Sequence, residues 1–296
     1  MIVITGATGR LGTLIVDRLL ERVPAGDVGV SVRDPARAAA LADRGVRVRR
    51  GDFTEPATLA AAFEGADQVL VISASIVGPV AEAANTAAMD AARAAGAARI
   101  LYTSHQAASP DSLFAAQHTH AASEAHLAGL GVPFTALRNG YYASAIPMLL
   151  GDALESGRLA LPADGPVSWT AHVDLADAAV AAVTEPGLLD GVTSPLTGPE
   201  LLDFADVARI LTDLTGRRIE RVVVDDEEWV AASTAPRPYA EFLLGMFLAA
   251  RRGEFAVTDP TLESVIGRPA RTVRTMLAEF SPGAGTPTPS AARTSP

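Results

Sequence analysis

The chain has 296 residues, a formal net charge of -10 and no cysteine. The acidic balance disfavours general binding to nucleic acid, which needs clustered Lys and Arg, and the lack of cysteine excludes disulfides, thiol nucleophiles and cysteine-bound metals. The length suits one large α/β domain or a nucleotide-binding domain with a smaller appendage. The sequence starts with no basic leader or long apolar segment, which predicts a cytoplasmic protein that does not span a membrane.

The first 20 residues predict a strand, a glycine loop and a helix. Residues 2–5 are apolar or β-branched, Gly6, Gly9 and Gly12 form the pattern Gly-x-x-Gly-x-x-Gly, and apolar residues then recur at helical spacing. In that order the glycines let a pyrophosphate approach the backbone, and the start of the helix stabilises its charge. The segment therefore predicts dinucleotide binding, although a glycine triplet can also mark only a tight turn.

The end of the second expected strand, over 28–32, bears on the choice of cofactor. A carboxylate at this place binds the ribose 2′-hydroxyl of NAD, whereas an arginine suits a 2′-phosphate. Arg33 stands there and favours NADPH, with NADH as the weaker alternative. The other interpretation is a solvated Arg33 that pairs with Asp34, which we expect to cap the next helical turn.

The following segments keep strands and helices in alternation, which predicts a Rossmann-type, doubly wound parallel sheet. Strands are expected at 46–49, 68–72, 100–103 and 132–137. Helices are expected at 56–63 and 79–95, and Thr54 is expected to cap the helix at 56–63. Asp52 and Phe53 either border an adenine or act as a turn former and a core residue. The small residues 73–75 follow a strand, where a ligand crevice is expected.

The stretch after residue 111 is expected to be helical and carries three histidines. His120 and Glu124 are four residues apart and would share a helix face, where the carboxylate can orient the imidazole for proton transfer. A surface pair is the alternative. His118 and His120 are two apart and splay on a helix, which disfavours a metal site.

Beyond residue 140 the alternation decays into a second, smaller mixed α/β lobe. Short strands are expected at 168–171 and 192–196, and helices near 174–184, 203–215, 236–252 and 272–280. Asp174 is expected to be an N-cap, and the apolar residues 243–248 suit a substrate pocket or a core helix. We divide the chain into a nucleotide-binding core, 1–140, a substrate lobe interleaved with it, 141–280, and a disordered tail, 281–296.

Seven segments together resemble a known family. They are ITGATGRLG at 4–12, VRDPARAAAL at 32–41, GDFTEPATL at 51–59, VLVISAS at 69–75, YTS at 102–104, HAASEAHL at 120–127 and LRNGYY at 137–142. The chain resembles the atypical short-chain dehydrogenases of the NmrA-like group, and within it the bacterial NAD(P)H:quinone oxidoreductase type 2 and triphenylmethane-dye reductase branch. The similarity spans about residues 1–280.

The resemblance implies a Rossmann domain that binds NADPH. Around the pyrophosphate it places Gly6, Ala7, Thr8, Gly9, Arg10 and Leu11, with Arg33 at the 2′-phosphate. It places Asp52 and Phe53 near the adenine and Ser73, Ala74 and Ser75 near the cofactor's ribose. The nicotinamide would lie beside Ser104, His120 and the turn formed by Asn139, Gly140 and Tyr141.

The resemblance also bears on the reaction. Wider relatives use a Tyr-x-x-x-Lys pair, and here His120 and Glu124 stand in that register, so no phenol is available to protonate a strongly basic alkoxide. This favours hydride transfer from NADPH to a quinone-like or other conjugated, aromatic small molecule, with His120 positioning or protonating it, Glu124 orienting His120, and Ser104 and Tyr141 completing the catalytic set. The alternatives are a non-catalytic NADP(H) sensor and a tailoring reductase or isomerase of a biosynthetic pathway. Monomer and homodimer both stay open.

Overall fold

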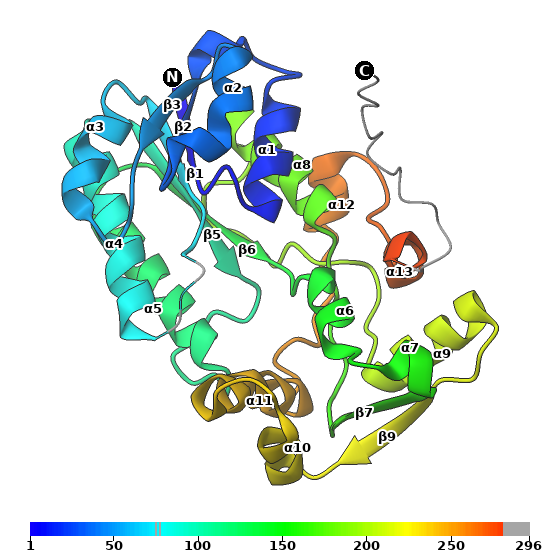
Figure 1. The fold of residues 1–296 in the computed structure, drawn as a ribbon. Coiled ribbons are helices and arrows are strands. Elements are labelled where there is room, and N and C mark those ends of the chain that lie inside the picture. Colours follow the sequence, from blue (N-terminus) through cyan, green and yellow to red (C-terminus); the bar gives the residue numbers. More distant parts are fainter. Residues whose placement is uncertain (75, 77, 281–296) are drawn as a thin grey trace, which may run out of the picture.

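Seven parallel strands form the central sheet of this computed structural model, in the order β3-β2-β1-β4-β5-β6-β8 (Figure 1). The structure describes residues 1–74, 76 and 78–280. The strands are β1 (Ile2–Thr5), β2 (Val28–Val32), β3 (Arg47–Arg50), β4 (Gln68–Val71), β5 (Arg99–His105), β6 (Phe134–Asn139) and β8 (Gly191–Val192). The predicted Rossmann-type fold is confirmed.

Helices cover both faces of this sheet, so its strands alternate between two apolar layers. Ile4 of β1 packs in the cluster that includes Ile15 and Val180, and its neighbour Val3 packs on the opposite face with Met89 and Leu127. The first face carries α1 (Arg10–Leu19), α8 (His172–Thr184) and α12 (Thr261–Ile266). The second carries α3 (Leu59–Phe63), α4 (Pro79–Ala94) and α5 (Ala115–Gly129), and α2 (Ala39–Asp43) lies beside β3.

The second half of the chain adds a lobe below the carboxyl ends of the strands in Figure 1. Its parallel pair is β7 (Arg158–Pro162) and β9 (Glu220–Val224). Its helices are α6 (Ile146–Leu149), α7 (Ala153–Ser156), α9 (Phe204–Thr215), α10 (Asp226–Ala232), α11 (Arg237–Arg251) and α13 (Val273–Phe280). Trp169, Phe204, Phe247 and Phe255 are fully buried and form its core. Short 3-10 helices cover Ala25–Asp27, Pro35–Ala38, Pro56–Thr58 and Ala143–Ala145.

Most elements expected from the sequence are present, with bounds that agree or shift by up to three residues, except that the strand expected at 192–196 is reduced to β8, Gly191–Val192. Asp34 caps its turn by accepting a hydrogen bond from the Ala36 amide. Three expectations are wrong. Residues 168–171 form no strand, and among them only Thr170 makes an isolated bridge, to Tyr142. The hydroxyl of Thr54 bonds to Asp52 instead of capping a helix. Asp174 lies inside α8, which already begins at His172, and it is fully buried against Arg268.

Two further expectations concern the extent and the surroundings of the chain. The predicted disorder of 281–296 lies outside the described residues. Among those that are described, no helix is long and apolar enough to cross a membrane.

Candidate functional site

The strand order reverses between β1 and β4, and this opens a crevice at the carboxyl ends of these two strands. The loop after β1 turns at Gly6, which has a φ of 60°. A Cβ on Gly12 would lie 2.2 Å from the carbonyl oxygen of Gly6, so only a glycine lets α1 pack this close to the loop. The glycine spacing thus fixes the start of α1 directly beneath the crevice.

The start of α1 offers free backbone donors. Gly9 is its N-cap and supplies no side-chain bond, and within the described residues the amides of Ala7, Thr8, Arg10 and Leu11 have no acceptor. Such amides, aligned with the helix dipole, form an anion site. The predicted pyrophosphate loop therefore has the donors that a dinucleotide needs.

The outer edge of the crevice carries the predicted residues of the adenosine half. Arg33 follows β2, is exposed and forms no ion pair within the described chain. The alternative of an Arg33–Asp34 pair is not observed, since the Asp34 carboxylate accepts from the Ala36 amide. Asp52 accepts bonds from the amide and the hydroxyl of Thr54 at 2.9 Å and 2.8 Å, and these bonds, with Arg33 nearby, lower its pKa. Phe53 packs at the edge of the core. Both are turn and packing residues, and their contact with an adenine stays a prediction.

The loop after β4 forms the inner wall of the crevice. The Ser73 amide donates to the Thr103 hydroxyl of β5 at 2.8 Å, and the Ala74 amide donates to Asn85 Oδ1 of α4 at 2.9 Å. These bonds hold the end of β4 beside the end of β5. Ser75 lies outside the described residues.

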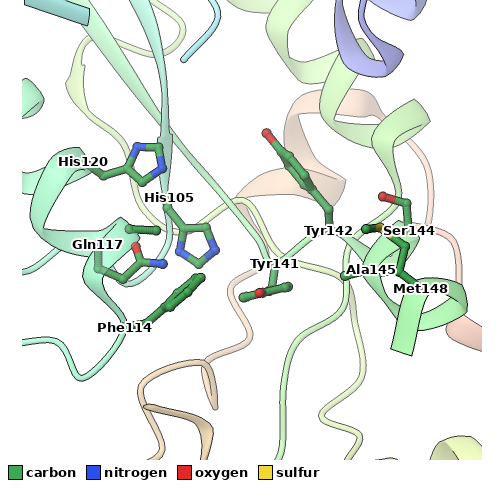
Figure 2. Close-up of a pocket in the computed structure, with 10 residues that line it drawn as sticks. His105, Phe114, Gln117, His120, Tyr141, Tyr142, Ser144, Ala145 and Met148 are labelled. Atoms are coloured by element: carbon green, nitrogen blue, oxygen red, sulfur yellow. The ribbon is translucent and has the colours of Figure 1, made fainter. Parts of the chain in front are cut away.

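A cavity of about 290 Å³ opens at the carboxyl ends of β5 and β6 (Figure 2). Among the described residues, its wall consists of aromatic rings, uncharged polar groups and small or aliphatic side chains, with no Asp, Glu, Lys or Arg. Its lining residues are His105, Phe114, Ala116, Gln117, His120, Tyr141, Tyr142, Ser144, Ala145 and Met148. His105 and Tyr141 meet edge to face, with ring centroids 5.4 Å apart.

The titratable groups of this cavity are neutral near pH 7. Burial lowers the pKa of His120 to about 4 and that of His105 well below its usual range. Burial also raises the pKa values of the Tyr141 and Tyr142 phenols. The cavity therefore suits an uncharged, flat molecule.

The hydrogen bond of His105 defines which of its nitrogens carries the proton. The Ala107 amide donates to His105 Nδ1 at 3.2 Å, and a backbone amide can only donate. In the neutral ring the proton is then on Nε2, which makes His105 a donor.

Two predicted catalytic residues form a separate buried network. Glu124 accepts a bond from the Ser104 hydroxyl at 2.6 Å and a bidentate pair from Arg138 at 2.9 Å and 2.7 Å. The predicted hydrogen bond from the His120 ring to Glu124 is wrong, since His120 Nδ1 is 2.9 Å from the Tyr102 hydroxyl instead. Helical spacing placed the pair on one face but did not show that Arg138 stands opposite the carboxylate.

The turn after β6 holds the remaining predicted residues. Asn139 is 1% exposed, its Nδ2 lies 3.4 Å from the Tyr142 hydroxyl, and its Oδ1 has no partner in the described chain. Tyr141 lines the cavity, and its predicted place beside the nicotinamide stays a prediction. Asn139 lies behind the wall, so its predicted cofactor contact is untested.

The other two histidines of α5 point elsewhere. His118 Nε2 is 2.7 Å from the Ser112 carbonyl oxygen, and His126 pairs with Asp90 at 2.8 Å. Over residues 1–74, 76 and 78–280, no group of three His, Asp or Glu side chains could hold a metal ion.

A second cavity, of about 520 Å³, lies between the starts of α1 and α8 and helix α13. It meets the first at Ser144, but Arg10, Arg271 and Glu279 give it a charged lining. Because Arg271 already pairs with Glu279 at 2.8 Å, this lining carries no clear ligand signature.

Comparison with known proteins decides the family. A model described as NAD(P)H-binding matches residues 6–186, which is more than half of the chain. The chain belongs to this NAD(P)H-binding family.

Its relatives agree with the predicted branch. Quinone oxidoreductase 2 of Escherichia coli is 33% identical, over 92% of this chain and 96% of that protein. An NmrA-like family domain-containing oxidoreductase of Aspergillus flavus is 29% identical, over 93% and 94%.

Two solved structures extend the likeness to the whole fold. The E. coli NADPH-dependent quinone oxidoreductase in complex with NADPH has a TM-score of 0.89 at 32% identity, covering 95% of this chain and 99% of that one. The Citrobacter triphenylmethane reductase in complex with NADP(H) has a TM-score of 0.87 at 32% identity, covering 94% and 100%. The predicted resemblance is confirmed.

Sequence reasoning missed most of the lining of this cavity, including His105, Phe114 and Gln117. The fifth strand was expected to end at Thr103, which left His105 in a loop, although β5 continues to it. Gln117 precedes His120 by three residues, and this spacing places both on one helix face. This spacing could have predicted Gln117 as a cavity residue.

Proposed function

We propose that this chain is an NADPH-dependent reductase that transfers hydride to an uncharged conjugated acceptor such as a quinone. The main observation behind this proposal is the aromatic cavity at the carboxyl ends of β5 and β6, whose described lining has no charged side chain. The related proteins support this proposal, since they include a quinone oxidoreductase and a dye reductase bound to NADPH or NADP(H). They favour it over the non-catalytic sensor.

The cavity is next to the cofactor crevice. The loop after β4 bonds to Thr103, and β5 ends two residues later at the cavity residue His105. A dinucleotide that follows the crevice from the glycine loop past Ser73 thus reaches the cavity with its nicotinamide end. The acceptor would lie against that end, between the sheet and the second lobe.

The reaction needs one hydride and one proton for each quinone reduced to hydroquinone. When bound, NADPH supplies the hydride. His105 Nε2–H and the His120 ring line the cavity and would bond the acceptor's oxygen while negative charge develops on it. A neutral imidazole is too weak an acid to give up its N–H proton, so the proton comes from solvent. His120 therefore positions the acceptor and does not protonate it.

The other predicted catalytic residues receive different roles in this proposal. Ser104 and Glu124 join β5 and β6 to α5 through Arg138, and their bonds are satisfied within the protein. Tyr141 supplies a flat wall for the acceptor. Cytoplasmic location and the choice between monomer and homodimer stay predictions from the sequence.

The first experiment follows the loss of reduced-nicotinamide absorbance with quinones, cationic triphenylmethane dyes and azo dyes, each with NADPH and NADH. We expect turnover with quinones and a higher kcat/KM with NADPH. Tight NADPH binding without turnover on any acceptor would favour the sensor, whereas a product other than a hydroquinone or reduced dye would favour a tailoring reductase.

Arg33→Glu tests the cofactor assignment. Arg33 stands where a 2′-phosphate is expected, so charge reversal should raise the Kd for NADPH by about 10- to 100-fold and change that for NADH little. Arg37→Glu, a nearby exposed site with the same charge change, is the control. Equal losses for both cofactors in Arg33→Glu would remove the 2′-phosphate assignment.

A further inference from the structure

A chain of hydrogen bonds runs from the cofactor crevice to His120, which lines the cavity. Its middle members, Asn85 and Tyr102, do not line the cavity. Asn85 of α4 is 1% exposed, and its Oδ1 accepts from the Ala74 amide at 2.9 Å. Its Nδ2 is 3.2 Å from the hydroxyl of Tyr102, which is fully buried in β5. That hydroxyl is 2.9 Å from His120 Nδ1.

The direction of each bond follows from the first. The Ala74 amide can only donate, so the Asn85 atom that faces it is the oxygen, and the atom that faces Tyr102 is the NH₂ nitrogen. An amide NH₂ also only donates, so the Tyr102 oxygen accepts there. The phenol keeps one proton to donate, and its neighbours besides Asn85 are His120 Nδ1, at 2.9 Å, and the Ser123 hydroxyl. Ser123 also lies 3.3 Å from Asn85 Nδ2, which can only donate to it.

Tyr102 and His120, the last two groups of this hydrogen-bond chain, are both neutral near pH 7. Burial raises the pKa of Tyr102, so its hydroxyl remains protonated. Burial lowers the pKa of His120 to about 4, so its ring is neutral, with one donor nitrogen and one acceptor nitrogen. A phenol that donates to Nδ1 leaves the ring proton on Nε2.

We propose that Tyr102, oriented by Asn85, is a positioning residue that fixes His120 with its proton on Nε2, as a hydrogen-bond donor to the acceptor in the cavity. Nε2 has no partner among the described residues, and the ring lines the cavity in Figure 2. With His105, the cavity then presents two N–H donors whose ring centroids are 5.9 Å apart. Two donors of this kind recognise carbonyl oxygen, as in a quinone. The link to turnover rests on the proposed function.

The test is nitrogen NMR of the histidine rings in the full chain labelled with ¹⁵N-histidine, which reports the protonated nitrogen without any substrate. We expect the wild type to show both His105 and His120 with the proton on Nε2. In Tyr102→Phe, His105 should be unchanged, because a backbone amide sets its state, while His120 should populate the form with the proton on Nδ1. Tyr142→Phe removes a hydroxyl from the same cavity that does not touch His120, and His120 should keep its state.

The kinetic measurement runs in parallel. Tyr102 does not line the cavity, so Tyr102→Phe should lower kcat with a quinone by about 3- to 10-fold and leave the KM for NADPH unchanged. A wild-type His120 ring with its proton on Nδ1 would overturn the proposal, even if Tyr102→Phe does not fold. A folded Tyr102→Phe in which the protonated nitrogen of His120 and kcat are both unchanged would overturn it as well. A wild type without turnover would refute the reductase, yet the NMR result would still decide the state of His120.

Discussion

Two buried glutamines near the cavity differ in whether their amides are bonded. Gln106 donates to the Phe255 carbonyl at 3.0 Å and accepts from the Tyr141 amide and the Ser168 hydroxyl. Gln117 is fully buried beside the cavity, and neither of its amide atoms has a partner in the described chain. An unpaired buried amide costs stability, so an acceptor that bonds it would recover that free energy.

Gln117→Met should therefore stabilise the protein while weakening acceptor binding. Met has nearly the same volume and no group to satisfy, so we expect the free energy of unfolding to rise by about 1–3 kcal/mol and the KM for a quinone to increase. Denaturant unfolding and steady-state kinetics measure the two effects. Gln106→Met, the same change at a fully bonded site, should lower stability. A loss of stability in both variants would show that Gln117 is satisfied in solution.

At this scale the sequence predicted where polar groups stand but not what they bond. His120 was predicted as a site residue from its helix and the family resemblance, and it lines the cavity. Its partner is Tyr102, which the sequence showed only as a strand residue, and Arg138 took the carboxylate of Glu124. Such pairings join residues from different elements, and local spacing carries no information about them.

At the scale of elements, the contact between α1 and the glycine loop holds the cofactor crevice open. Gly12 of α1 approaches the Gly6 carbonyl so closely that a Cβ would lie 2.2 Å from its oxygen and 2.9 Å from Ala7 Cα. Both neighbours are backbone and cannot turn aside as a flexible side chain does. Any side chain at residue 12 must therefore move the helix.

Gly12→Ala should damage both stability and cofactor binding. We expect a loss of about 3 kcal/mol in the free energy of unfolding, because the added methyl overpacks a backbone contact. We also expect a higher Kd for NADPH, because the amides at the start of α1 move. Thermal unfolding with and without NADPH measures both. Gly26→Ala has open space around its Cβ and should change neither. Unaltered NADPH affinity in Gly12→Ala would mean that the loop does not bind the pyrophosphate.

The first six strands were predictable because they alternate with helices and most of them are buried on both faces, as in β2, where all five residues are buried. The edge strand β3 has no fully buried residue and was predictable from the alternation alone. The pair β7 and β9 was missed. Its strands are about 60 residues apart in sequence, and half of their side chains face outward, so neither shows a buried run. The pair is packed against helices from separate parts of the chain, α7 and α10 on β7 and α9 on β9, and no local sequence pattern predicts such contacts.

At the scale of the whole molecule, burial keeps three imidazoles neutral, and this couples folding to pH. The pKa values of His120 and His172 are lowered to about 4, and that of His105 is well below its usual 6.5. In the unfolded chain these rings take up protons near pH 6.5, whereas the folded chain resists protonation. The unfolded state thus binds more protons between about pH 6.5 and 4, and stability falls as pH falls through that window.

The free energy of unfolding should accordingly be lower at about pH 5 than at about pH 7, by about 2 kcal/mol for each ring with a folded pKa near 4. His172→Gln should reduce this pH difference by about one such share, whatever it does to stability at pH 7, because it removes one imidazole buried beside Arg10 and Tyr142. Denaturant titrations at the two pH values measure the difference. Val173→Ala, in the same helix turn, should lower stability equally at both. An unchanged pH difference in His172→Gln would show that this ring already titrates in the folded protein as it does in the unfolded chain.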